Sequence, residues 1–226
     1  KLILDLSRSN VNVGAWDVKK ESEYAISGSQ SANGKIYFYA ESSAAIGEVE
    51  HVGMLEVIPF HGNDRNVELK VGFSFVSVEN AKANLEQEVN AKGFNEVYAE
   101  ADAEWESILS RIQVKGGTDE QRDMFYTTLY KSFLWPCLRS DCNGDYRDVR
   151  GQVVNNGHDY YTSPCFWDDH RDKLVLLGLI SPEVTCDVMK SVTDMGEKRF
   201  VAFVQYLLQG MDGVHGGDAS GQSHGK

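Results

Sequence analysis

The chain has 226 residues, 42% hydrophobic and 25% charged, which is typical of a folded globular protein of one or two domains. Its net charge of −12 argues against nucleic-acid binding, because phosphate contacts depend on clustered lysine and arginine. No apolar run reaches roughly 18 residues, so no membrane-spanning helix is predicted. The four cysteines lack CxxC spacing, which argues against zinc. We expect buried free thiols, although Cys137 and Cys142 are near enough in sequence for a loop disulfide in an oxidising compartment.

The first part of the sequence has the pattern of β-strands. From Val67 to Phe75 apolar residues alternate with polar or small ones, which is the period of a strand with one buried face. Further strands are expected at Ile36–Ala40 and Leu55–Phe60, and turn-forming residues separate the three. These short strands predict an antiparallel β-sandwich over residues 1–78.

The pattern becomes helical after residue 78. One face of a predicted helix is apolar, and the other is rich in glutamate; the apolar face contains Val97, Ala101, Trp105, Ile108 and Ile112. We interpret residues 79–115 as a helical linker with a solvated acidic face. After Gly116-Gly117, the spacing of Thr118 and Gln121 predicts a capping box that opens the next helix. Trp135-Pro136 is expected to end that helix.

The remaining sequence predicts pairs of helices after a long polar loop from Cys137 to Pro164. Loops of that length in compact domains are often functional. A helix is expected from Asp168 to Leu179, and Ser181-Pro182 is expected to start another. Consecutive antiparallel helices predict the start of a helical toroid over residues 116–226. The tail from Gly210 to Lys226 is rich in glycine, serine and histidine and shows no periodicity.

The segment from His158 to Arg171 concentrates aromatic rings, acids and bases. A pyranose presents hydroxyl groups at its rim and apolar C–H bonds on its faces, so a sugar site combines flat aromatic rings with charged groups. Trp167 could supply the aromatic platform, and Asp168 and Arg171 could bind the hydroxyl groups. The alternative is that the aromatic residues belong to the core, while Asp168 and Arg171 merely stabilise a helix.

Several motifs resemble, in the same order, those of the family 92 glycoside hydrolases, which are calcium-dependent exo-acting α-mannosidases. They are Val71 to Ala81, Gly116 to Thr118, Phe125 to Tyr130, Asp141 to Arg147 and Gly157 to Tyr161. The resemblance implies a mixed β and α fold, with an antiparallel β-sandwich (1–78), a helical linker (79–115) and the beginning of an (α/α)6 catalytic domain (116–226). It also implies inverting hydrolysis of terminal α-linked mannose, with an expected α-1,2 preference, Ca²⁺ as cofactor and a mannose-containing glycan as substrate. A periplasmic or extracellular location is implied as well.

Within this resemblance, Trp167 and Asp168 match a Trp-Asp pair expected to contact the non-reducing mannose, with Arg171 one turn further along. This chain has Asp169 and His170 where the family has a smaller polar residue and an aromatic one, which leaves the linkage preference open. The family's acid, base and most calcium ligands belong to the later helical domain and match no position here. We therefore expect this chain to be an N-terminal portion of the enzyme.

Other residues are candidates on shorter patterns. His158 and Asp159 are interpreted as supporting the loop or binding substrate. The turn from Asp141 to Asp145 offers alternating oxygen ligands for calcium, but it lacks the distal glutamate of an EF-hand and is a common turn composition. His215 and Asp218 could be ligands or general bases, although they lie in the glycine-rich tail. Two other functions stay open: a carbohydrate-binding module without catalysis, and an (α/α)6 glycosidase specific for another sugar.

Overall fold

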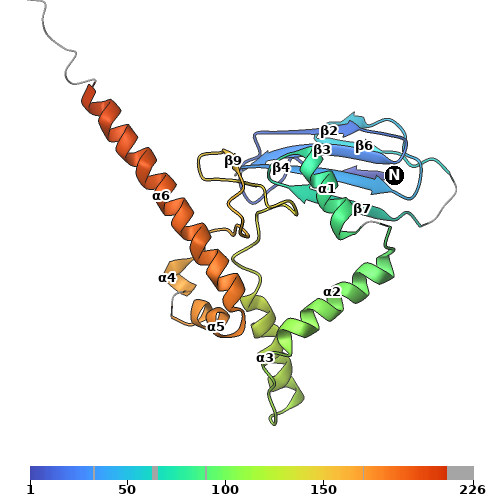
Figure 1. Cartoon of the computed structure of the whole chain (residues 1–226). Coiled ribbons are helices and arrows are strands. Elements are labelled where there is room, and N and C mark those ends of the chain that lie inside the picture. The colour runs from blue at the N-terminus through green and yellow to red at the C-terminus, as the bar shows by residue number, and fades with distance from the viewer. Residues whose placement is uncertain (33, 63–65, 90, 170, 213–226) are drawn as a thin grey trace, which may run out of the picture.

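A computed structural model of the chain describes residues 1–32, 34–62, 66–89, 91–169 and 171–212, with side chains described as far as residue 200. In these residues, strands β1 to β7 come first and helices α1 to α6 follow (Figure 1). A small ribbon of β8 (Tyr146–Arg147) and β9 (Val153–Val154) lies between α3 and α4 in the sequence. This order confirms the predicted mixed β and α fold.

Two antiparallel sheets form the β part. The smaller contains, in order, β1 (Leu2–Leu4), β6 (Leu55–Ile58) and β5 (Glu50–Val52). The larger contains, in order, β2 (Ala15–Lys20), β3 (Ala25–Ala32), β4 (Gly34–Ser42) and β7 (Leu69–Ser74). The three strands predicted from alternating sequence are confirmed as β4, β6 and β7.

The two sheets face each other across an apolar core. Ile26, Phe38 and Ala40 of the larger sheet pack with Ile58 of the smaller sheet and with Ile46. Partly buried side chains from the N-terminal segment pack against this core, among them Leu2, Leu4 and Leu6. The predicted antiparallel β-sandwich is therefore confirmed.

Helix α1 (Val78–Glu88) covers the other face of the larger sheet. Ser77 caps its first turn, and Ala81 and Leu85 pack against β3 and β4. Gly72 of β7 permits this close packing, because a Cβ atom there would lie only 2.8 Å from the Cβ of Leu85. The larger sheet thus has apolar partners on both faces.

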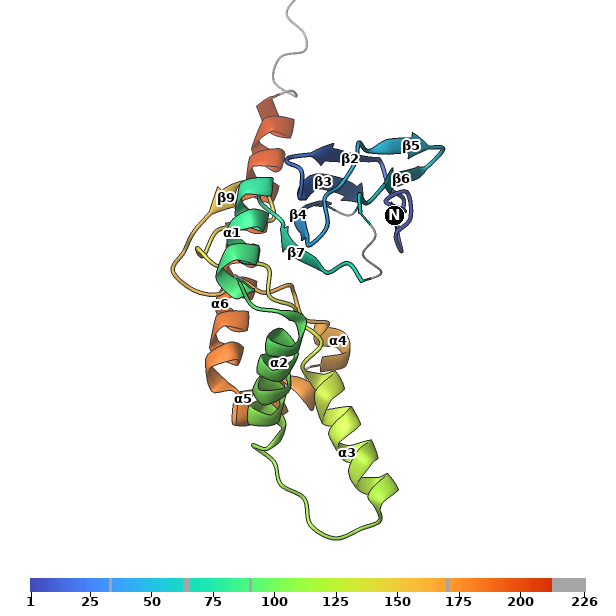
Figure 2. The same cartoon turned by 90° about the vertical axis from the view of Figure 1, so that its right-hand side faces the viewer.

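Helices α2 (Phe94–Leu109) and α3 (Asp119–Ser132) leave the β part and meet through Trp105, which packs against aromatic rings at the end of α3. Figure 2 shows the long connection between them at the far end of the helical part. The predicted capping box is confirmed: the Thr118 hydroxyl accepts the N–H of Gln121 at 3.3 Å, and the Gln121 side chain accepts the N–H of Thr118 at 3.0 Å.

The single helix predicted from Asp168 to Leu179 is wrong. The structure has one helical turn, α4 (Phe166–Asp169), and a separate helix, α5 (Lys173–Ile180). Asp169 accepts a hydrogen bond from the backbone before α4, and Asp172 accepts one from the first residue of α5. The spacing of apolar residues is continuous through this segment. The hydrogen bonds of the two carboxylates nevertheless divide it into two helices.

Helix α6 (Pro182–Asp212) begins at the predicted proline and packs along α5, where Leu177 and Val188 are buried. Arg111, after α2, donates a 2.6 Å hydrogen bond to the carbonyl of Ile180 at the end of α5. The guanidinium therefore joins the linker to this helical pair. None of the helices in the described residues is both long and apolar enough to cross a membrane.

Each of the four cysteines is a free thiol. Three of them are exposed, so the expectation of burial is wrong for Cys137, Cys165 and Cys186. Cys142 is partly buried, and burial together with the charge of Asp141 raises the pKa of its thiol. The loop disulfide considered between Cys137 and Cys142 is not formed.

Candidate functional site

The two ends of the loop 137–164 lie side by side. The backbone N–H of Arg139 donates to the carbonyl of Tyr160 at 2.7 Å. Trp135, just after α3, donates its indole N–H to the carbonyl of Ser163 at 3.2 Å. Together these bonds place the start of α4 next to the end of α3.

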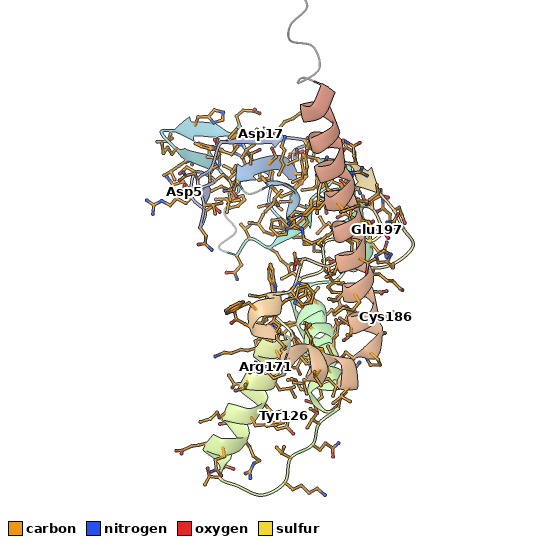
Figure 3. All side chains as sticks on the ribbon, turned by 90° about the vertical axis from the view of Figure 1, so that its left-hand side faces the viewer. Asp5, Asp17, Tyr126, Arg171, Cys186 and Glu197 are labelled. Carbon is orange, nitrogen blue, oxygen red and sulfur yellow. The ribbon has the colours of Figure 1, made fainter. Side chains whose placement is uncertain are left out.

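Helix α4 presents the residues predicted to bind sugar. Trp167 is 89% exposed, so its ring does not belong to the core that the described residues form. Asp168 is also exposed, and one of its oxygens accepts a 3.2 Å hydrogen bond from the thiol of Cys165. Arg171 is exposed just after α4, among the short helices (Figure 3). An aromatic ring, a carboxylate and a guanidinium therefore lie on one short surface segment.

Asp169 has a different role from its neighbour Asp168. It is buried, its Oδ2 accepts the N–H of Cys165 at 3.0 Å, and its Oδ1 forms a 2.9 Å ion pair with Lys173. These contacts fix α4 to the preceding loop and to α5. They leave Asp168 as the carboxylate of this pair that faces solvent.

His158 and Asp159 line a separate cavity of about 540 Å³, together with residues 141–144 and Asp187 of α6. The residues of α4 are not part of its lining. The His158 ring lies 6.4 Å from the ring of Tyr146, and its Nε2 atom is buried without a hydrogen-bond partner among the described residues. Both roles proposed for this pair, loop support and substrate binding, stay predictions.

The turn at residues 141–145, considered as a calcium loop, is closed by protein hydrogen bonds. The buried carboxylate of Asp141 accepts them at 2.7 Å from Ser74, 2.8 Å from Asn80 and 2.9 Å from Asn84. The other acid of the turn accepts hydrogen bonds from two asparagine amides. Both oxygens of Asp141 are therefore engaged by donors from β7 and α1, and the turn is fixed to the β part.

The described residues do not fit the calcium ion that the family resemblance implies. Calcium takes about six to eight oxygen ligands. Nowhere in the described part of the chain do three or more His, Cys, Asp or Glu side chains come together as a metal site. His215 and Asp218, the other candidate ligands, lie outside the described residues.

A buried polar network fixes α6 to the β8–β9 ribbon. Tyr146 is fully buried, donates to Asp194 at 3.1 Å and stacks on Tyr160 with ring centroids 3.8 Å apart. Lys198 forms ion pairs with Asp194 at 2.7 Å and with Asp148 at 3.4 Å. This network holds the loop 137–164 against the middle of α6.

Burial shifts the protonation of these groups. Burial and the charge of Asp194 raise the pKa of Tyr146, and they raise the pKa of Tyr160 to about 12. Burial alone would raise the pKa of Asp148, but two backbone N–H groups of the β8–β9 turn and the Lys198 ammonium hold it below its usual range. The tyrosines therefore stay neutral and Asp148 stays charged near neutral pH, as a structural network requires.

A family model described as the glycosyl hydrolase family 92 catalytic domain matches residues 80–220. The chain belongs to glycosyl hydrolase family 92. The matched region begins in α1 and includes α3, the loop 137–164 and α4. No curated protein sequence gives a significant match to this family 92 chain.

Solved structures of family 92 proteins share its fold. The α-mannosidase BT3965 from Bacteroides thetaiotaomicron superposes on 83% of the chain with a TM-score of 0.73 at 20% identity. The glycosyl hydrolase ccman5 gives 0.74 at 24% identity over 84%, and the inverting mannosidase BT2199 from Bacteroides thetaiotaomicron gives 0.71 at 25% over 86%. These matches cover 29%, 28% and 30% of the longer proteins, so this chain spans less than a third of each.

In this family 92 chain, sequence reasoning singled out Trp167 and Asp168 of α4 but gave no structural role to Asp169, which fixes that helix in place. The only local signal for Asp169 was its spacing of four residues from Lys173, which suits a helical ion pair. The side-chain donors to Asp141 and the Lys198 partner of Asp148 are remote in sequence, so no local pattern marks these contacts.

Proposed function

We propose that this chain is part of a glycosidase that removes terminal α-linked mannose from glycans, by inversion and with a preference for α-1,2 linkages. Support comes from its family 92 membership and from its similarity to the solved α-mannosidases. One of those relatives, BT3965, has been solved in complex with mannoimidazole. The substrate proposed for this chain is accordingly a mannose-containing glycan.

The exposed ring of Trp167 beside the carboxylate of Asp168 carries this proposal. Burying a large aromatic side chain typically stabilises a fold by about 3 kcal/mol. An exposed tryptophan lacks this stabilisation, and a role in binding explains its exposure. Its ring would stack on the apolar face of mannose. Asp168 would accept hydrogen bonds from ring hydroxyls, and Arg171 would donate them. These groups bind and orient the sugar, and we assign neither the acid nor the base to the described residues.

Calcium dependence and location belong to the same proposal. Because the described residues do not form a calcium site, the ion would be held by groups outside them. When bound, calcium would supply a positive charge for sugar hydroxyls. We also propose a periplasmic or extracellular location, in keeping with a glycan substrate.

The test is release of mannose from an α-1,2-linked mannobiose by a purified, active-length protein that contains this chain, with and without EDTA, alongside a matched α-glucoside. The proposal predicts mannose release that EDTA abolishes and calcium restores, with no cleavage of the glucoside. Because the chain spans less than a third of its solved relatives, binding of methyl α-mannoside is measured in parallel by calorimetry. Trp167→Ala should abolish that binding, whereas Trp16→Phe, on β2, should leave it unchanged.

The outcomes separate the rival functions. Cleavage of the glucoside alone would contradict the mannose specificity and favour another (α/α)6 glycosidase. Binding at Trp167 without release by a longer, active-length protein would favour a carbohydrate-binding module. If the protein neither binds methyl α-mannoside nor releases mannose, the whole proposal is contradicted.

A further inference from the structure

The β-sandwich has an apolar groove along one side, with a volume of about 300 Å³. Its lining consists of apolar side chains from both sheets: Leu2, Leu4, Leu6, Ile26, Phe38, Ala40, Leu69, Val71 and Phe73. The side chains from β7 are the most accessible part of this lining, and Phe73 is 59% exposed. A large aromatic side chain thus lies open to solvent beside the core of the sandwich.

The register of the larger sheet explains this groove. Phe73 lies opposite Phe38, and Val71 lies opposite Ala40, so the side chains of β7 continue the inner face formed by β4. In the smaller sheet, the leucines of β1 pack against the core residues of β3 and β4. No strand of the described residues lies over β7, and the apolar side chains of β7 are left uncovered.

The strands on this side of the sandwich also have unpaired backbone edges. β1 pairs only with β6, and β7 pairs only with β4, so each is the edge strand of its sheet in the described part of the chain. Edge strands present unpaired N–H and C=O groups that template the addition of another strand. A strand added beside β1 would lie over the exposed side chains of β7.

We propose that this groove binds one further β-strand, supplied by family 92 polypeptide outside residues 1–226, which pairs with β1 and covers Leu69, Val71 and Phe73. The strand continues both the β5–β6–β1 ladder and the apolar core. The groove has only apolar lining residues, so the strand carries large apolar side chains at every second position. The solved relatives are about three times as long as this chain and contain polypeptide that could supply it.

A single strand fits this groove better than a second copy of the chain. β7 extends one strand beyond β1, because β1 already lies over β3 and β4. Two copies paired through β1 would therefore bring their two β7 strands into the same space. One added strand beside β1 fills the space over β7 without that overlap.

The test uses ¹⁵N-labelled chain and a soluble peptide of about nine residues that alternates valine with threonine and lysine, which is within the usual length of a strand. The control peptide has the same composition with its valines in one block. We expect the alternating peptide to bind and to shift the amide signals of β1 and β7. The block peptide should bind at least about tenfold more weakly.

Substitutions locate the binding. Val71→Lys puts a charge in the groove and should weaken binding at least about tenfold. Val52→Lys, at an exposed position on β5 away from the groove, should leave the dissociation constant within about twofold. If the lysine variant of Val71 fails to fold, Val71→Thr keeps the side-chain shape and should still weaken binding.

Three results would overturn the proposal. Equal binding of the two peptides would show that the groove does not recognise a strand. Peptide-induced shifts confined to other elements would place the binding elsewhere. A stable dimer of the chain alone in sedimentation velocity, lost in Val71→Lys but not in Val52→Lys, would assign the groove to a second copy.

Discussion

Replacing Asp141 by alanine should destabilise the fold more than any other single change in its loop. Its carboxylate is the common acceptor for Ser74 on β7 and for Asn80 and Asn84 on α1. It therefore connects its loop to β7 and α1, whose three donors are 57 to 67 residues away in the sequence. Removing it leaves three polar donors facing a cavity.

The size of the effect follows from those three hydrogen bonds. Each bond to a charged group contributes about 1.5–3 kcal/mol, and the sum is reduced because the variant no longer buries a carboxylate. We expect Asp141→Ala to lower the free energy of unfolding by about 3–5 kcal/mol. In a chain of this length, that corresponds to a fall in Tm of about 10 °C.

Urea unfolding followed by circular dichroism measures this loss, and Asp145→Ala is the matched control. Asp145 belongs to the same turn, but its carboxylate pairs with the exposed amides of Asn143 and Asn155. The control should therefore lose less than about 1 kcal/mol. Similar losses for the two variants would refute the assignment of Asp141 as the central acceptor.

Three further predictions concern packing and protonation. Because its folded pKa lies below the usual 3.8, Asp148 stabilises the fold above that pH and loses this effect as the pH falls through the folded pKa. Asp148→Asn should therefore reduce the difference in unfolding free energy between about pH 6 and about pH 3, and an unchanged difference would contradict it. Gly72→Ala should destabilise the fold by about 1–3 kcal/mol in urea, whereas Gly196→Ala, in open space on α6, should stabilise it by up to about 1 kcal/mol. In an ultraviolet titration, Tyr160 should ionise near pH 12 and Tyr146 still later, and ionisation of both near pH 10 would contradict their burial.

The parts of the fold that were predictable depend on local patterns. Alternation identified β4, β6 and β7, because each has one face toward the core. The Thr118 capping box and the Pro182 helix start are set by neighbouring residues, so they were predictable too. The composition of the segment and the family resemblance singled out Trp167 and Asp168, whereas α4 as a separate turn and its exposure came from the structure.

The parts that were not predictable depend on remote or competing contacts. The apolar period from Leu174 to Ile180 favoured one helix with Asp168, but the buried carboxylate of Asp169 ends α4 early. Alternation also predicted a buried face for β7, yet Phe73 is exposed because the smaller sheet does not extend over it. Sequence period shows which face is apolar and cannot show what covers it.

The most direct test of the account is the response of ¹⁵N-labelled chain to methyl α-mannoside, with the Trp167 indole signal identified by comparison with Trp167→Phe. We predict saturable shifts of that indole and of the α4 amides, with much smaller shifts for methyl α-glucoside. An unmoved Trp167 signal, or equal shifts with both sugars, would contradict a mannose subsite on α4.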